Sequence, residues 1–112
     1  MIEQIQDIKE ISCVDLKKKM DASENFVLID VREPEEFEVC MIPGSILIPL
    51  SEIEDHLDEL DKDASYVLHC KMGGRSTKAA YVMKEKGFKS VISLKGGIYQ
   101  WSQDIDKEMT LY

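Results

Sequence analysis

The sequence predicts an α/β fold in which a five-stranded, mainly parallel sheet carries helices on both of its faces. Short apolar runs alternate with helical patterns along the chain, which is typical of sheets built from strand–helix units. The run 26–29 (FVLI) is apolar at every position, as expected of a strand buried on both faces. The length of 112 residues fits one domain. We expect it to span 1–112, with a core of about 10–104 and a C-terminal tail at 105–112.

Five segments are rich in β-branched and other apolar residues, and turn residues border several of them. We expect strands at 11–14, 26–29, 45–48, 65–69 and 91–94.

Helices are expected between these strands because capping signals and apolar stripes occupy the connecting segments. Acidic residues after Pro34 favour the positive end of a helix. Asp15 is expected to cap a short helix that runs through Met20, and Pro34 to start the second helix. A capping box over 51–54 opens the third helix, which ends at about Leu60. The fourth helix runs from Ser76 to Lys86 and is closed by Gly87. Gly96 and Gly97 form a turn into the last short helix, which carries Ile98 and Trp101 on one side.

Composition excludes several classes of function. The net charge of −8 argues against a nucleic-acid partner, and no apolar run reaches the ~18 residues that a membrane span needs. The charged start MIEQIQDIKE does not resemble a secretory signal, so we expect a cytoplasmic protein. Three cysteines and two histidines without ligand spacing indicate no metal, no other cofactor and no disulfide framework.

Two polar residues stand directly after apolar strands. Asp30 follows 26–29, and Cys70 follows 65–69. Because ligands of parallel sheets bind beyond the carboxyl ends of the strands, we expect both residues on the same rim.

The stretch after Cys70 favours a reactive thiolate. The candidate loop consists of Lys71, Met72, Gly73, Gly74 and Arg75, and the next helix is expected to start near Ser76. Its two glycines permit a tight loop whose N–H groups form an anion nest, and the helix adds its positive end. Together these features are expected to favour the thiolate, which is the nucleophile. The alternative is an inert buried cysteine beside an ordinary turn.

Three motifs, in order and at family spacing, resemble the rhodanese (sulfurtransferase) family. CKMGGRS resembles its active loop Cys-x-x-Gly-x-Arg-Ser. DVREPEEFEVCMIPGSILIPL resembles Asp-x-Arg-x-x-x-Glu-Phe followed by Ile-Pro-Gly-Ala and Ile-Pro-Leu, and LKGGIYQW resembles the closing Gly-Gly-x-x-x-Trp. The chain departs from the family at Cys40 and Met41, where Gly-His is usual.

The resemblance implies a rhodanese-like fold with a persulfide on Cys70. It implies that the N–H groups of residues 71–75 hold the outer sulfur, and that Asp30, Arg32 and Ser76 brace the loop. A small anionic donor such as thiosulfate would supply the sulfur, and a small thiol or an acceptor protein would receive it.

Two readings from other classes remain open. The first is a non-catalytic binding module. The second is a cysteine-dependent phosphatase or arsenate reductase, whose motif resembles His-Cys-x5-Arg. Only four residues, 71–74, separate Cys70 from Arg75 here, and this shorter loop favours a single sulfur atom over a phosphate.

Several side chains have two interpretations each. Lys71 either attracts the anionic donor or is a solvated lysine, and Arg75 either binds substrate or forms an ion pair. His69 should point away from Cys70, because adjacent strand residues face opposite sides, and we expect a hydrogen-bonded structural histidine. Cys40 is either a resolving thiol or a passive replacement, and we expect Cys13 in the core.

Overall fold

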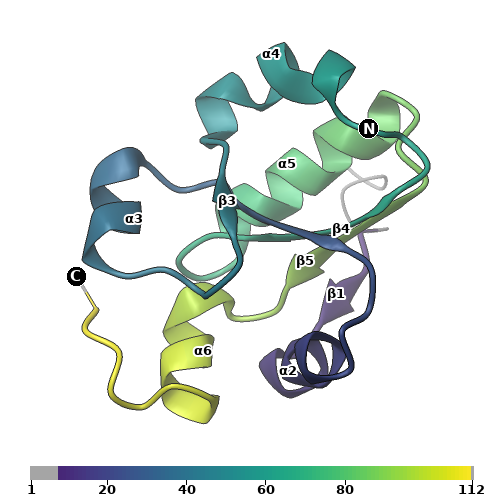
Figure 1. Cartoon of the computed structure of the whole chain (residues 1–112). Helices are drawn as coiled ribbons and strands as arrows, with labels where there is room; N and C mark the ends of the chain where they lie inside the picture. Colours follow the sequence, from purple (N-terminus) through teal and green to yellow (C-terminus); the bar gives the residue numbers. More distant parts are fainter. Residues whose placement is uncertain (1–7, 112) are drawn as a thin grey trace.

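The computed structural model describes residues 8–111 and confirms the α/β class (Figure 1). Its five strands form one parallel sheet in the order β1-β5-β4-β2-β3. The strands are β1 (Glu10–Ile11), β2 (Val27–Asp30), β3 (Ile46–Leu47), β4 (Ser65–His69) and β5 (Ser90–Leu94). The strand that precedes the candidate loop, β4, lies at the centre of the sheet, so both of its edges are hydrogen-bonded.

Helices cover both faces of the sheet (Figure 1). The helices are α2 (Cys13–Asp21), α3 (Pro34–Val39), α4 (Ile53–His56), α5 (Gly74–Glu85) and α6 (Gly97–Asp104). Apolar side chains of α4 and α5 pack with Leu68 and Cys70 of the β4 segment on one face. Those of α2 and α6 pack with Val67 on the other face. The alternation along β4 therefore divides the core into two clusters, and Cys70 belongs to the α4/α5 side.

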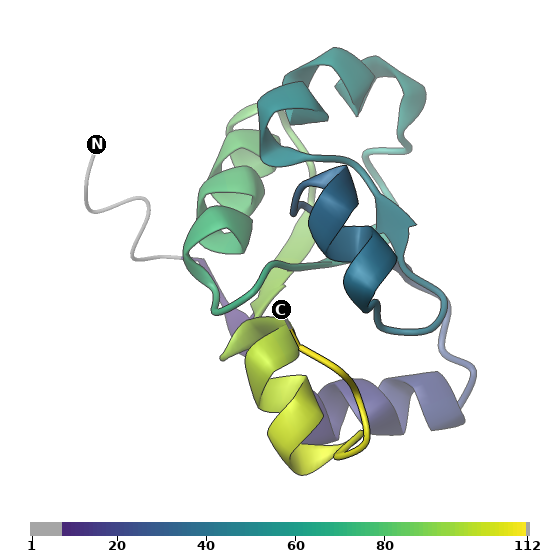
Figure 2. The ribbon, with the colours of Figure 1, turned by 90° about the vertical axis from the view of Figure 1, so that its left-hand side faces the viewer.

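The carboxyl end of the sheet is surrounded by three helices. In the view of Figure 2, α3, α5 and α6 stand around the loop that leaves β4. The β2 and β4 strands pair with Asp30 opposite His69, so the segments after Asp30 and after His69 emerge at the same level. The expectation that polar residues after these two strands share one rim is confirmed.

The start of the chain differs from the expected strand at 11–14. The strand β1 ends at Ile11, and the hydroxyl of Ser12 accepts a hydrogen bond from the N–H of Asp15 at 3.1 Å. Ser12 is therefore the N-cap of α2, and the assignment of the cap to Asp15 is wrong. Serine and aspartate are both favoured N-cap residues, so residue type alone did not distinguish Ser12 from Asp15. The helix also starts earlier than expected because β1 ends at Ile11.

The expected helix at 51–60 is broken into three short pieces. These are the 3₁₀-helix η1 (Leu50–Glu52), α4 and the 3₁₀-helix η2 (Leu57–Glu59). No side-chain cap is formed at the start of η1 or α4, so the predicted capping box between Ser51 and Glu54 is wrong. A capping box occurs instead at the start of α3, between Glu33 and Glu36. The N–H of Glu33 donates to the carboxylate of Glu36 at 2.9 Å, and the side chain of Glu33 accepts from the backbone N–H of Glu36.

The segment after α6 folds back onto the domain. Ile105, Met109 and Leu111 are partly buried and pack against the α2/α6 side of the core. Within residues 8–111, the structure contains no helix with the length and apolar character needed to cross a bilayer.

Candidate active site

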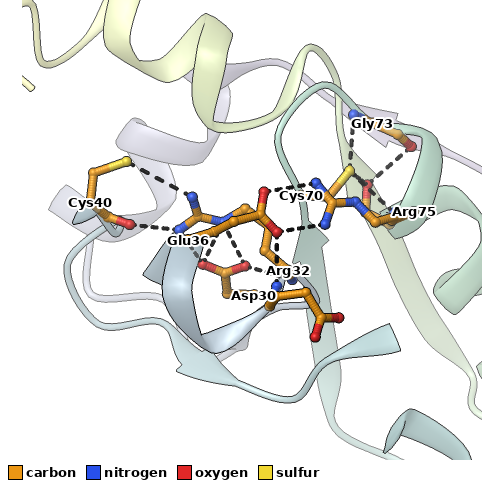
Figure 3. A network of polar contacts seen from close by, with 9 residues as sticks. Asp30, Arg32, Glu36, Cys40, Cys70, Gly73 and Arg75 are labelled. Carbon is orange, nitrogen blue, oxygen red and sulfur yellow. Dashed lines mark hydrogen bonds and ion pairs between the residues drawn. The ribbon is translucent and has the colours of Figure 1, made fainter. Parts of the chain in front are cut away.

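Cys70 lies immediately after β4 and is 1% exposed. Its Sγ accepts a hydrogen bond from the N–H of Gly73 at 3.1 Å and another from the N–H of Ser76 at 3.4 Å (Figure 3). Gly73 has φ +120°, which a residue with a side chain rarely adopts. It is the N-cap of the twelve-residue helix α5. The sulfur thus faces backbone donors at the positive end of a helix, an arrangement that favours negative charge on sulfur.

Ser76 links the sulfur to the neighbouring strand. Its hydroxyl oxygen lies 3.6 Å from the Sγ of Cys70 and 2.7 Å from the hydroxyl oxygen of Ser93. It also donates to the carbonyl of Gly73 at 3.2 Å. Ser93 is fully buried in β5. Ser93 was not predicted as a site residue, although a serine inside the otherwise apolar end of a strand was a signal.

The first turn of α6 holds the other side of the loop. The N–H of Ile98 donates to the carbonyl of Cys70 at 2.9 Å, and the N–H of Tyr99 donates to the carbonyl of Lys71 at 3.0 Å. A Cβ on Gly97 would lie 2.5 Å from the carbonyl oxygen of Cys70 and closer still to that of Lys71. Gly97, predicted only as a turn residue, is therefore required for this close approach. These contacts direct two loop carbonyls toward α6 and away from the sulfur.

Arg75 forms a two-point ion pair with Glu36 of α3. Its Nη1 donates to Oε1 at 2.7 Å and its Nη2 donates to Oε2 at 3.1 Å. The side chain of Arg75 is 36% exposed and that of Glu36 is 19% exposed. The ion-pair interpretation of Arg75 is thus the one that this geometry supports. Its partner was missed, because the two residues are 39 positions apart and no local pattern links them.

Asp30 and Arg32 form a fully buried ion pair, with Arg32 Nη2 donating to Asp30 Oδ2 at 2.7 Å. The same nitrogen donates to the backbone carbonyl of Cys40 at 2.6 Å, and Nη1 lies 3.8 Å from the Cys40 Sγ. These hydrogen bonds anchor the segment that follows α3. The bracing of residues 71–75 by this pair stays a prediction, and α3 contacts Arg75 through Glu36. The shortest of these hydrogen bonds is accepted by the backbone carbonyl of Cys40. Because every residue type has a backbone carbonyl, the presence of Cys40 and Met41 in place of Gly-His does not remove this hydrogen bond.

His69 is fully buried beside Asp30. Its Nε2 lies 3.7 Å from the Asp30 Oδ2, and neither ring nitrogen makes a hydrogen bond of normal geometry, although the nearby backbone of Cys70 raises the pKa of the ring slightly. The expectation of a hydrogen-bonded histidine is therefore wrong, because the Arg32 guanidinium already occupies the carboxylate. Burial lowers the pKa of His69 to about 4, and the Asp30 charge offsets only part of this effect. His69 is a neutral ring in the core.

The remaining thiols lie away from the loop. Figure 3 shows Cys40 and Cys70 on opposite sides of Arg32 and Glu36, which disfavours a resolving role for Cys40. Cys13 is 2% exposed in the α2/α6 cluster. Burial raises its pKa to about 11, and Asp104 adds to the shift, so Cys13 is an inert core thiol.

Comparison with known proteins identifies the family. Residues 12–104 match the family model of the rhodanese-like domain, so the chain belongs to the rhodanese-like domain family. YtwF of Bacillus subtilis (strain 168), named as a candidate sulfurtransferase, is 43% identical over 95 residues, which cover 85% of this chain and 91% of YtwF. YrkF of the same organism, named as a candidate sulfur carrier protein, is 41% identical over 100 residues. The match covers 89% of this chain and 54% of YrkF, so the chain spans about half of that relative's length.

Solved structures agree with this assignment. A rhodanese-like domain protein from Staphylococcus aureus superposes with a TM-score of 0.81 at 30% identity, covering 94% of this chain and 99% of that one. The fold is therefore rhodanese-like. Together with relatives named as sulfurtransferases, the family match supports a transferase with a rhodanese-type role in sulfur transfer.

Proposed function

We propose that the chain transfers sulfane sulfur through a persulfide on Cys70, and that thiosulfate serves as a donor. The observation that carries the proposal is the pair of backbone donors at the sulfur, the N–H groups of Gly73 and Ser76. A thiolate held by these groups is a nucleophile. After sulfur is added, the outer sulfur of the persulfide is itself anionic, and inward N–H groups of the same loop suit it.

The reaction has two balanced halves. In the first, the Cys70 thiolate bonds to the outer sulfur of thiosulfate, the bond to the sulfite group breaks, and sulfite leaves with the electron pair. In the second, an acceptor thiolate bonds to the outer persulfide sulfur, and the Cys70 thiolate is released. A small thiol or a protein thiol fits this role, and cyanide replaces it in an assay.

The short loop supports sulfur rather than phosphoryl transfer. Only four residues separate Cys70 from Arg75, and the guanidinium of Arg75 is engaged by Glu36. A phosphate carries three non-bridging oxygens and needs a wider ring of donors than one sulfur atom.

A thiosulfate:cyanide assay on three cysteine variants tests the proposal. We expect Cys70→Ser to abolish thiocyanate formation, while Cys13→Ser and Cys40→Ser keep most of it. Substantial turnover by Cys70→Ser would reject the mechanism. If the unaltered protein shows no turnover but hydrolyses an aryl phosphate or reduces arsenate, the alternative chemistry replaces it. Inactivity in every assay would favour a non-catalytic binding module.

A further inference from the structure

We propose that Glu36 sets the donor preference of the site by neutralising Arg75, so that sulfane-sulfur donors with one negative charge are favoured over dianions such as thiosulfate. This inference rests on the proposed function and deepens it, because it names the charge class of the preferred donor.

The ion pair lies beside the backbone groups that hold the Cys70 sulfur (Figure 3). Arg75 directly precedes Ser76, whose N–H donates to the Cys70 Sγ. Its guanidinium points from the first turn of α5 toward α3 and meets the Glu36 carboxylate at two points (Figure 3). Both side chains retain partial exposure, whereas Cys70 is buried. A donor that approaches the sulfur therefore comes close to a cation whose charge is already compensated.

The two-point geometry makes this compensation strong. Parallel N–H···O bonds between guanidinium and carboxylate are the favoured arrangement for such pairs. A donor that takes the two Arg75 N–H groups bound by Glu36 must displace this carboxylate. The carboxylate keeps its hydrogen bond from the N–H of Glu33 at 2.9 Å and therefore stays close to the bound anion. The repulsion from this carboxylate grows with the charge of the donor. The net charge of −8 acts in the same direction.

The attraction that remains suits a singly charged group. The N–H groups of Gly73 and Ser76 supply partial charges at one sulfur position. The Cys70 Sγ itself occupies this position, so a donor keeps its own charge as it approaches. A monoanion brings one negative charge to the neutralised pair, whereas a dianion brings two. Glu36 would therefore affect mainly the binding of donors, as a specificity-determining residue.

A matched pair of donors isolates this charge effect. Thiosulfate is a dianion and benzenethiosulfonate is a monoanion, and each gives its outer sulfur to the Cys70 thiolate. Sulfite leaves in the first case and benzenesulfinate in the second, each with the electron pair of the broken bond. In a two-step transfer, kcat/KM for the donor reports the first half-reaction.

The experiment measures kcat/KM for both donors with cyanide as acceptor, in the unaltered protein, Glu36→Gln, Glu36→Asp and Glu35→Gln. Glu35→Gln is the matched control, because it removes the same charge from an exposed position of the same helix. We expect Glu36→Gln to raise the kcat/KM for thiosulfate about tenfold relative to the kcat/KM for benzenethiosulfonate. A change of this order is expected when one partly screened charge near the site is removed. The change should lie mainly in KM. Glu36→Asp and Glu35→Gln should keep the original ratio.

Two results would overturn the inference while leaving the proposed function intact. In the first, Glu36→Gln loses activity toward both donors equally and melts at a lower temperature, which would make the ion pair merely structural. In the second, Glu35→Gln shifts the ratio as much as Glu36→Gln, which would make the effect one of overall charge. If the unaltered protein turns over neither donor, the proposed function fails and this inference falls with it.

Discussion

The backbone N–H of Ile98 donates a 2.9 Å hydrogen bond to the carbonyl oxygen of Cys70, so the helix after β5 holds the residue that follows β4. The next N–H, that of Tyr99, does the same for the carbonyl of Lys71 at 3.0 Å. The start of α6 thus stabilises the backbone of the loop at the point where the sulfur is positioned. Gly97 allows this contact because it brings no side chain between the two backbones.

Gly97→Ala should disable the loop. The added Cβ would overlap the carbonyl oxygens of Cys70 and Lys71, so the loop must move away from α6. We expect the rate of persulfide formation to fall at least about tenfold. The melting temperature should also drop, because a side chain added at a tightly packed position that cannot relax destabilises the fold. Rapid-quench measurement of persulfide formation and a thermal melt check both effects.

Gly44→Ala is the control for backbone strain. Gly44 also has a positive φ, +87°, but a Cβ there would meet nothing within 4 Å. This variant should lose roughly 1–2 kcal/mol of stability from its left-handed backbone alone and keep its rate of persulfide formation. Equal rates in the two variants would show that the contact with α6 does not position the loop.

Asp30→Asn should destabilise the fold strongly. The substitution keeps the shape of the side chain but leaves the charge of the buried Arg32 without its carboxylate. We expect the free energy of unfolding in urea to fall by about 3–5 kcal/mol. Asp21→Asn is a suitable control, since its ion pair with Lys17 is exposed and should contribute less than about 1 kcal/mol. Similar losses in both variants would be inconsistent with a dry, structural Asp30–Arg32 pair.

His69 should make stability depend on pH in a defined window. Its pKa is lowered from 6.5 to about 4 in the folded protein, so between these values the unfolded chain binds a proton that the folded chain does not. Stability is therefore full above pH 6.5 and falls as the pH drops toward 4. The contribution is on the order of 3 kcal/mol for a shift of this size.

His69→Leu isolates this contribution. Neither ring nitrogen of His69 makes a hydrogen bond of normal geometry, so an apolar side chain removes the titration without breaking such a bond. Urea unfolding at a series of pH values should give a shallower loss for this variant than for the unaltered protein. The partly exposed His56, changed to Gln, is the control for removing a histidine outside the core. Parallel slopes in His69→Leu and the unaltered protein would rule out His69 as the source.

The order of strands and helices was predictable because it depends on local patterns. Runs such as 26–29 are apolar at every position, and a strand buried on both faces requires such a run. The errors occurred where local signals were weak or ambiguous. The strand β1 is only two residues long, and Ser12 and Asp15 are equally good caps by residue type.

The loop was predictable in outline and incomplete in detail. The position of Cys70 after a strand and the glycines beside it suffice to indicate an anion-binding turn. The contacts of Glu36, Ser93 and Gly97 with the loop were not predictable, because each depends on segments distant in sequence that meet only in the folded sheet. Arg32 illustrates the same limit. Its proximity to Asp30 followed from their spacing, but its bond to the carbonyl of Cys40 depends on the path of the chain after α3.

The central claim, a persulfide on Cys70, is tested most directly by the intact mass of the protein after incubation with thiosulfate and removal of excess donor. We predict a gain of one sulfur atom per chain in the unaltered protein, in Cys13→Ser and in Cys40→Ser, which a small thiol reverses, and no gain in Cys70→Ser. An unchanged mass in the unaltered protein, or the same gain in Cys70→Ser, would contradict the account.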